Sequence, residues 1–439
     1  MSHGVGQRMS LSELQPTTRR LILARGLRSF GQGALVVDFA LYLDALGWSG
    51  VTIGVLLSAA GLSGGLLSLL TGVLSDRVRR RPFLLFYEAV SLVAGTATLL
   101  SANAVVITIA AILVGYGRGA NGAAGPFSPA EQSWLAEEVD PWRRGQVYSL
   151  NAAVGFLGMG LGALIAMLPS FLHTVVGGIL AYRLLFLLVA VPSAVNLVLF
   201  YGTRERYQGP RAKVRLGAKE RMQESQVRKQ ENRLLLRLML VNAFNGLAIG
   251  LTGPLISYWF ALKFHVGPSY IAPVIAASFL LTAKLSLLTG RISRRVGIVR
   301  PVVVERLVGL ILYAILPLVP MYWLASLIYL LRTVFSRGPA GAQQALTMGL
   351  VREQRRGLAA SLNVVSFLVP RSIGPGLSGY LLDLDLFGLP FYLAAALQSV
   401  YLIGYTRFFR GYEPPLGEQR AEAGERSPSQ ILPIRQARS

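Results

Sequence analysis

Apolar residues gather in long runs along this chain, and short polar breaks separate the runs. A helix that crosses a bilayer needs about 20 mostly apolar residues. We place twelve such spans, at residues 21–45, 50–74, 82–102, 104–138, 146–168, 180–202, 234–262, 268–290, 300–318, 321–350, 357–382 and 386–409. The longest of them tilt or extend beyond the bilayer. The pattern predicts an all-α membrane protein with twelve transmembrane helices.

The overall composition fits a chain that is mostly embedded in lipid. Hydrophobic residues make up 53% of the chain and charged residues 15%, and the mean hydropathy is +0.51. Soluble domains carry about 25% charged residues. The net charge of +22 would suit a nucleic-acid partner, but the arginines lie in the short breaks between apolar runs. The composition therefore indicates a lipid bilayer, and no nucleic acid, as the surroundings of this chain.

Chemistry that needs cysteine or clustered histidine is not indicated. The chain has no Cys, and its three His residues, His3, His173 and His265, are far apart and near ends or loops. A nucleotide-binding Gly-Lys-Ser/Thr motif is also missing from the sequence, and we assign no paired carboxylates to catalysis. We therefore expect neither an enzyme with catalytic residues nor a metal site or cofactor.

The positive charges fall in every second break between the spans. One set of breaks contains arginine clusters within residues 77–81, 143–144, 294–295 and 352–356, whereas the other set contains no Lys or Arg and is flanked only by Lys263. Lys and Arg concentrate on the cytoplasmic side of membrane proteins. We expect both termini to be cytoplasmic and the protein to lie in the cell (plasma or inner) membrane.

The longest polar stretch lies near the middle of the chain. Residues 203–233 contain ten Lys/Arg and four Glu, which is typical of a solvated linker, although residues 219–230 could form a charged helix on the membrane face. A regulatory domain is the alternative. The tail after Glu413 is polar and predicted to be disordered. We divide the chain into a cytoplasmic segment (1–20), an N-terminal six-helix bundle (21–202), the linker (203–233), a C-terminal six-helix bundle (234–410) and a disordered tail (411–439).

Two internal matches indicate that the two bundles are homologous. The hexapeptide Leu-Ser-Leu-Leu-Thr-Gly occurs at residues 67–72 and again at 285–290, each time before basic residues. Arg-Arg-Gly occurs at 143–145 and at 355–357, with Ser-Leu-Asn four residues later in both copies. Repeated helix bundles are the usual construction of secondary transporters, in which the substrate path runs where the halves meet.

The break after the second span resembles a motif of the major facilitator superfamily, and the resemblance covers residues 20–410. That loop motif reads Gly-x-x-x-Asp-Arg/Lys-x-Gly-Arg-Arg/Lys, and this chain supplies Gly72, Asp76, Arg77, Arg80 and Arg81, with Arg79 at the usual glycine. The helix 4 motif Arg-x-x-Gln-Gly appears as Arg118-Gly-Ala-Asn121-Gly122. The glycine-rich motif of the antiporter branch is degraded at 158–166. The resemblance implies two six-helix bundles that work by alternating access.

The resemblance also implies a cytoplasmic gate in the first loop. An acid at a helix end can accept hydrogen bonds from the N-terminus of a neighbouring helix and pair with an arginine. The candidate gate residues are Gly72, Asp76, Arg77 and Arg80 in the first half and Gly290 and Arg295 in the second. The alternative is that the arginines only anchor the topology. Because Arg294 replaces the acid in the second copy, we expect the first-half gate to be the stronger one.

Ionisable residues within spans are candidates for function because they are costly in hydrocarbon. Asp38 lies about 15 Å of helical rise beyond Arg28, near the bilayer centre, where burial favours a protonated carboxyl. We expect Asp38 to be the main proton site, with Arg118 and Glu131 as further proton-coupling residues. The alternatives are a structural pair between Asp38 and an arginine, and a plain ion pair for Glu131.

Further polar residues within the spans are candidates for a substrate cavity. Cations outnumber deep acids in the second half, and cations that face a shared cavity would attract an anionic or zwitterionic substrate. Asn242, Asn245 and Thr252 repeat at helical spacing in the seventh span, where Thr252 is the counterpart of Asp38. The candidate cavity residues are Arg28, Asn242, Asn245, Thr252, Arg332 and Arg371.

The sequence thus predicts a secondary active transporter that moves a small organic solute by alternating access. We expect it to be coupled to protons and to work as a monomer, with export as one direction left open and an organic anion favoured over a lipophilic cation. Three alternatives stay open: an uncoupled facilitator, a drug or cation exporter, and a membrane sensor on the same fold that transports nothing.

Overall fold

The structure is a computed structural model of the whole chain, and it describes residues 14–75, 79–119, 123–139, 144–203, 205, 218–296, 299–337 and 356–409. All regular structure in these ranges is helical. The first half of the chain contains α1 (Pro16–Ala45), α2 (Gly50–Ser75), α3 (Arg81–Leu100), α4 (Ala104–Val114), η2 (Gly125–Phe127), α5 (Ser128–Glu137), α6 (Arg144–Ile165), α7 (Leu168–Val176), α8 (Gly178–Arg183), η3 (Leu184–Phe186) and α9 (Leu187–Tyr201).

The second half repeats this series of long helices. It contains α10 (Ala218–Thr252), α11 (Ile256–Phe264), α12 (Pro268–Val296), α13 (Val299–Ile315), η4 (Leu316–Leu318), α14 (Tyr322–Arg337), α16 (Arg356–Asp383) and α17 (Leu389–Phe409). When helices on the two sides of a short break are joined, the described elements make the predicted twelve spans. The fold class predicted from the apolar runs is confirmed.

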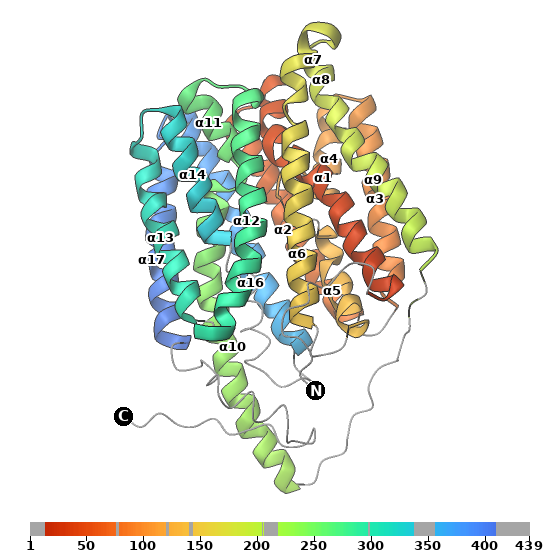
Figure 1. The fold of residues 1–439 in the computed structure, drawn as a ribbon, viewed down its shortest axis with the longest axis vertical. Helices are drawn as coiled ribbons and strands as arrows, with labels where there is room; N and C mark the ends of the chain where they lie inside the picture. The colour runs from red at the N-terminus through yellow and green to blue at the C-terminus, as the bar shows by residue number, and fades with distance from the viewer. Residues whose placement is uncertain are drawn as a thin grey trace, which may run out of the picture.

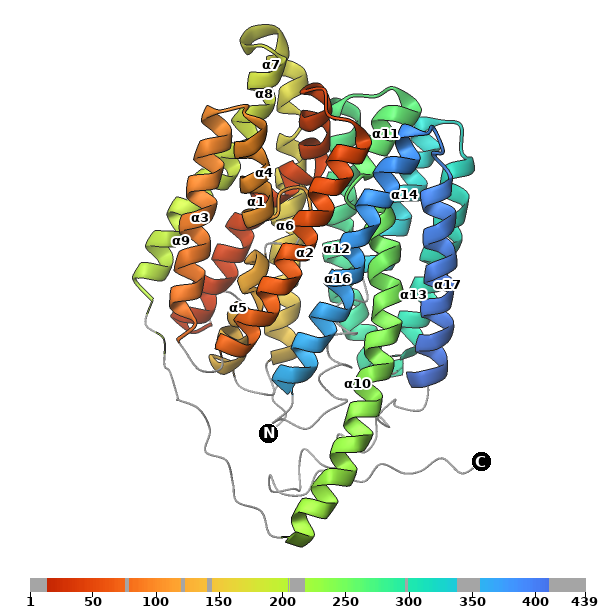
Figure 2. The same cartoon turned by 180° about the vertical axis from the view of Figure 1, so that it is seen from behind.

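The helices stand roughly parallel in two groups. In Figure 1 the red-to-yellow helices of the first half lie beside the green-to-blue helices of the second half, and Figure 2 shows the same division from behind. Six stretches of the described residues are long and apolar enough to cross a membrane by length and composition. Helices suit this environment because each satisfies its own backbone hydrogen bonds, which hydrocarbon cannot do.

Apolar side chains cover both the inside and the outside of the bundle. Phe39 and Trp259 are buried in one large apolar core that spans both halves, whereas Val93, Val198 and Ile403 each expose two thirds or more of their surface. In water an exposed apolar surface of this extent would promote association. Facing lipid, it is the expected outer surface of a membrane protein.

The two halves pack together through two long helix pairs. Helix α2 packs along α16 and α6 packs along α12, while α1 contacts α11. We call the end where α1 begins and α17 ends the basic end, because it contains Arg19, Arg20 and Arg79–Arg81, and we call the other end the opposite end. The contact between α2 and α16 extends from Gly50, which lies against Gly379, to Gly65, which lies against Leu368. The halves are therefore in contact from the opposite end to the middle of the bundle.

The prediction of one continuous helix over 104–138 is wrong. Helix α4 ends at Val114, and Gly115, Gly117, Gly119 and Gly125 all have positive φ angles before α5 begins at Ser128. Positive φ is readily adopted by glycine and is incompatible with a right-handed helix. The fourth span is therefore two short helices joined by an irregular segment, and this segment contains Arg118.

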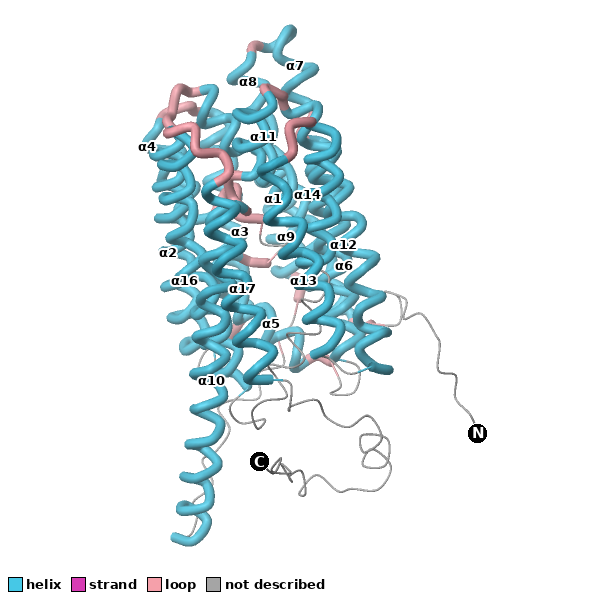
Figure 3. The backbone as a smooth tube through the Cα atoms, turned by 90° about the vertical axis from the view of Figure 1, so that its left-hand side faces the viewer, coloured by secondary structure: helices cyan, strands magenta, loops and turns pink. Residues whose placement is uncertain are grey.

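The seventh span begins earlier than predicted. Helix α10 starts at Ala218, inside the stretch predicted as a linker, and continues without a break to Thr252. Figures 1 and 3 show that its first turns extend out of the basic end of the bundle instead of folding back across that end. The charged helix expected over 219–230 is thus the beginning of this long helix.

Candidate functional site

Among the buried residues of helix α1 are the ionisable residues Arg28 and Asp38. Arg28 forms ion pairs with two acids of the same half: its Nε lies 3.2 Å from Glu88 Oε1 of α3, and its Nη2 lies 2.5 Å from Glu131 Oε1 of α5. All three side chains are almost fully buried. The structure therefore brings the predicted residues Arg28 and Glu131 together, and it adds Glu88, which the sequence analysis did not single out.

The surroundings of this ion-pair cluster are polar. Asn196 of α9 donates from Nδ2 to Glu88 Oε1 at 3.2 Å, and the backbone N–H of Ala124 donates to Glu131 Oε2 at 3.2 Å. Arg25, one turn before Arg28, is buried within electrostatic range of Glu131. Two cations and two acids thus balance each other inside the first bundle. Buried charges are tolerated when they are paired and hydrogen-bonded in this way.

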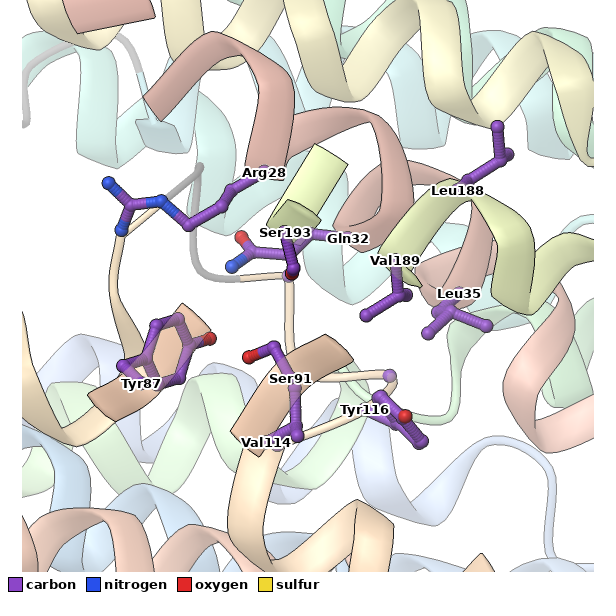
Figure 4. A pocket seen from close by; sticks show the side chains of 13 residues that line it. Arg28, Gln32, Leu35, Tyr87, Ser91, Val114, Tyr116, Leu188, Val189 and Ser193 are labelled. Carbon is purple, nitrogen blue, oxygen red and sulfur yellow. The ribbon is translucent and has the colours of Figure 1, made fainter. Parts of the chain in front are cut away.

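A cavity lies beside this cluster, inside the first half. It is lined by α1, α3, the irregular segment of the fourth span and α9, and Figure 4 shows the side chains around it. Polar groups come from Arg28, Gln32, Tyr87, Ser91 and Ser193. Leu35, Leu188 and Val189 close the apolar side. Arg28 is therefore the member of the ion-pair cluster that borders a small cavity within the bundle.

Asp38 lies ten residues further along α1 and is only 1% exposed. Neither of its carboxylate oxygens has a hydrogen-bond partner in the part of the chain that the structure describes. No cation of those ranges lies within ion-pair distance of Asp38, and Tyr182 of α8 is within electrostatic range of its carboxyl. Within the described residues Asp38 is thus a buried acid without a compensating charge, and the alternative, a structural pair with an arginine, is not formed there.

Arg118 and Arg371 meet across the interface between the halves. Arg371 of α16 donates from Nη2 to the backbone carbonyl of Arg118 at 2.8 Å. This carbonyl is available because Arg118 lies in the irregular segment, where helical hydrogen bonding is interrupted. Arg118 therefore lies at the domain interface with Arg371, and it forms no ion pair with Asp38 or Glu131.

Thr252, Arg332, Asn245 and Asn242, the candidate cavity residues on α10 and α14, each contact a polar or aromatic residue of the second half. Thr252 and Tyr313 share a hydrogen bond, and the Arg332 guanidinium lies 4.0 Å above the Tyr313 ring. Asn245 accepts from Gln398 at 2.9 Å and from Arg306 at 3.4 Å. Asn242 donates to Asn363 of α16. The counterpart of Asp38 is thus a neutral hydroxyl that is hydrogen-bonded to Tyr313.

The predicted gate is only partly within the described residues. Asp76 and Arg77 lie outside them. Gly290 and Arg295 belong to the described helix α12, but the surroundings of these two residues are not described. The same holds for Gly72, which belongs to the last turn of α2. Arg80 is paired with Glu137 of α5, at 2.7 Å between Nη2 and Oε1, and its backbone N–H donates to Glu205. These contacts of Arg80 involve the first bundle and the start of the linker, and they do not reach the second bundle.

At the opposite end, a gate-like contact was missed by the sequence analysis. Asp383, at the end of α16, accepts hydrogen bonds from the backbone N–H groups of Gly50 and Val51, each at 2.8 Å. These two groups are at the N-terminus of α2, where N–H groups have no partner within the helix. The carboxylate thus links the second half to the first. Both residues that were missed had a signal in the sequence. Asp383 is an acid at the end of a span, and Glu88 is the single acid within its span.

The fold has twelve spans in two groups, and charged residues are buried inside one group and between the two. These features define the class of this protein as a polytopic membrane transporter. The family model described as "Major Facilitator Superfamily" matches residues 21–341 and 238–439. The chain belongs to the Major Facilitator Superfamily, so the resemblance seen in the sequence motifs is confirmed.

Solved structures of transporters share the fold. The nucleoside transporter NupG is 12% identical with a TM-score of 0.64, covering 90% of this chain and 100% of that one. A bacterial homologue of the lysosomal transporter Spinster is 17% identical with a TM-score of 0.64, covering 97% and 100%. A D-xylose–proton symporter is 14% identical with a TM-score of 0.65, covering 91% and 98%. No curated protein matches the sequence.

Proposed function

We propose that this member of the superfamily is a proton-coupled secondary active transporter that moves a small organic solute by alternating access. The observation that carries the proposal is the Asp38 carboxyl, which is buried in a span with neither oxygen hydrogen-bonded. A carboxylate in such surroundings is strongly disfavoured unless it takes up a proton or meets a cation. Asp38 is therefore neutral in this conformation and releases its proton in one that hydrates it.

The other predicted proton-coupling residues take different roles in this proposal. Glu131 and Glu88 both pair with the single cation Arg28, so in this proposal they hold the first bundle together and are not the main proton site. The cavity that Arg28 borders, with Gln32 and Ser91 on its wall, is where water would reach this cluster in the proposal. Arg118, at the domain interface, helps to bind the substrate in this proposal. Asp38 is the site at which proton binding changes the charge of the bundle.

The interface between the halves supports the alternating-access part of the proposal. The halves pack against each other through α2 and α16 at the opposite end, and Asp383 links the two helix ends there. We place the basic end, with both termini, in the cytoplasm of the cell (plasma or inner) membrane. The bundles of residues 21–202 and 234–410 then rock about the centre, and the conformation described is the one closed towards the outside. We expect a monomer to be sufficient, since each chain contains a complete interface of this kind.

Uptake into proteoliposomes with an imposed pH gradient tests the function. The vesicles are offered a defined mixture of organic anions, cations and neutral solutes, and mass spectrometry measures which solutes accumulate. The proposal expects some solute to exceed its external concentration only when the gradient is present. Equilibration without accumulation would indicate an uncoupled facilitator, loss of a preloaded cation would indicate a drug or cation exporter, and no movement of any solute would indicate a sensor on this fold.

A further inference from the structure

A group of cations without a paired acid among the described residues lies at the interface between the halves. Arg118, Arg337 and Arg371 are close enough that both Arg118 and Arg337 repel the charge of Arg371. None of the three forms an ion pair with a carboxylate of the described ranges. All three keep part of their surface open to solvent. A group of cations inside a bundle, without an acid among the described residues, needs an anion from elsewhere to reduce the repulsion.

The surroundings of Arg118 hold its side chain in place. Its guanidinium group lies against two glycines, Gly64 of α2 and Gly115 at the end of α4, and a Cβ atom at Gly64 would be 2.6 Å from Nη1. Any larger residue at these positions would occupy the place of the guanidinium. The two glycines therefore form a recess that fixes the Arg118 head at the wall of the interface.

Arg371 has donors left over after its contact with Arg118. One Nη2 donor is used by the Arg118 carbonyl, at 2.8 Å, and a guanidinium group has five N–H donors in a planar fork. The remaining donors have no acceptor in the described residues. A planar fork with free donors fits the two oxygens of a carboxylate or phosphate group.

Aromatic rings lie under these cations. The Arg371 guanidinium is 5.8 Å from the Phe367 ring centroid, and the Arg337 guanidinium is 5.1 Å from that of Phe279. Phe279 in turn stacks on Phe156 of α6, with 6.4 Å between the ring centroids, so this aromatic group also bridges the two halves. The site thus offers cations for an acidic group and rings for an apolar body.

We infer that the substrate is an organic oxyanion with an apolar or aromatic body, and that its acidic group binds between Arg371 and Arg118 at the interface of the halves. This inference rests on the proposed transport function and names its substrate class. Arg337 supplies a second cation beside the apolar body. Because the two main arginines come from different halves, binding of the anion joins the halves and neutralises the repulsion between them.

Three probes of similar shape and different charge test this inference: benzoate, benzamide and benzamidine. The full-length protein is purified in detergent, without any pH gradient, and its melting temperature is titrated with each probe. Phenyl phosphate is added as a fourth probe, which separates a preference for carboxylate from one for phosphate. We expect benzoate or phenyl phosphate to raise the melting temperature in a saturable manner, whereas benzamide and benzamidine have no such effect.

The variants assign the effect to the site. Arg371→Gln should weaken binding of the anionic probe by about tenfold or more, because a charge-assisted forked contact is lost, and Arg371→Lys should weaken it less. Arg337→Gln is an independent variant that keeps the Arg118 contact intact, and it should also weaken binding. Arg407→Gln, which removes an exposed cation from the end of α17, is the matched control and should bind as the unmodified protein does.

Three results would overturn the inference. They are no stabilisation by either anionic probe, equal stabilisation by benzamide, and anion binding that is unchanged in both Arg371→Gln and Arg337→Gln. The measurement needs no gradient and no transport. If no anion binds at the site, the protein can therefore still show proton-driven uptake of another class of solute. Conversely, anion binding without gradient-driven uptake would contradict the proposed coupling and leave the site standing.

Discussion

The Asp383 carboxylate accepts a hydrogen bond from the backbone N–H of Gly50 at 2.8 Å, and the two residues belong to different halves of the bundle. Gly50 begins α2, so the acid also faces the positive end of the helix dipole. A Cβ atom on Gly50 would collide with Asp383 Oδ1, which is why the helix can start so close to the acid only with glycine. This contact holds the opposite end of the interface closed.

Replacing Asp383 with alanine should shift the protein towards the conformation that is open at that end. A side chain that caps a helix N-terminus contributes about 1 kcal/mol, so the open population should rise about fivefold. Ser372 is buried against Gly61 in the same interface, and the chain has no Cys. The labelling rate of Ser372→Cys by a maleimide therefore reports opening. Asp383→Asn, which keeps an acceptor, should have a smaller effect. An unchanged rate in Asp383→Ala would contradict the role of this contact.

The ion-pair cluster of the first half should be necessary for stability. Arg28→Met leaves Glu88 and Glu131 buried without the cation that lies 3.2 Å and 2.5 Å from them. Removing one partner of a buried pair costs about 3–5 kcal/mol, so the melting temperature in detergent should fall markedly. The triple variant with Glu88→Gln and Glu131→Gln added should recover part of the loss, because it removes the uncompensated charges. A single variant as stable as the unmodified protein would show that the pairs contribute nothing.

The recess around Arg118 gives a test that leaves every charge in place. Gly64→Ala puts a Cβ atom 2.6 Å from Arg118 Nη1, so the guanidinium must move. We expect a several-fold loss of benzoate affinity with little change in melting temperature, because a flexible arginine head can shift more easily than backbone. Gly267→Ala is the control, since no atom lies within 4 Å of a Cβ built there. Equal benzoate affinity in the two variants would count against a fixed Arg118.

Much of the fold could be predicted from the apolar runs, because the length of a span is set by the bilayer. The run at 50–74 corresponds to α2 (Gly50–Ser75), and the run at 357–382 to α16 (Arg356–Asp383). The break in the fourth span was missed because hydropathy does not register backbone conformation. The spacing of Gly115, Gly117 and Gly119 was the available signal, since all three adopt positive φ.

The candidate site was less accessible to sequence reasoning, because its contacts join distant helices. Arg28 and Glu131 were each singled out, but their pairing depends on how α1 and α5 pack, and 103 residues separate them. The contact between Arg371 and the Arg118 carbonyl required the broken helix that hydropathy did not reveal. Asp38 was found because one acid in an apolar run is conspicuous whatever its neighbours are.

The central claim is that Asp38 couples proton movement to transport, and one comparison in proteoliposomes tests it most directly. A solute that the unmodified protein accumulates is followed in Asp38→Asn under two conditions, an imposed pH gradient and exchange against the same solute inside the vesicle. Asp385→Asn, an exposed acid whose positive φ suits asparagine, is the matched control. We predict that Asp38→Asn still exchanges the solute but no longer accumulates it above the external concentration. Gradient-driven accumulation in Asp38→Asn equal to that of the control would contradict the account.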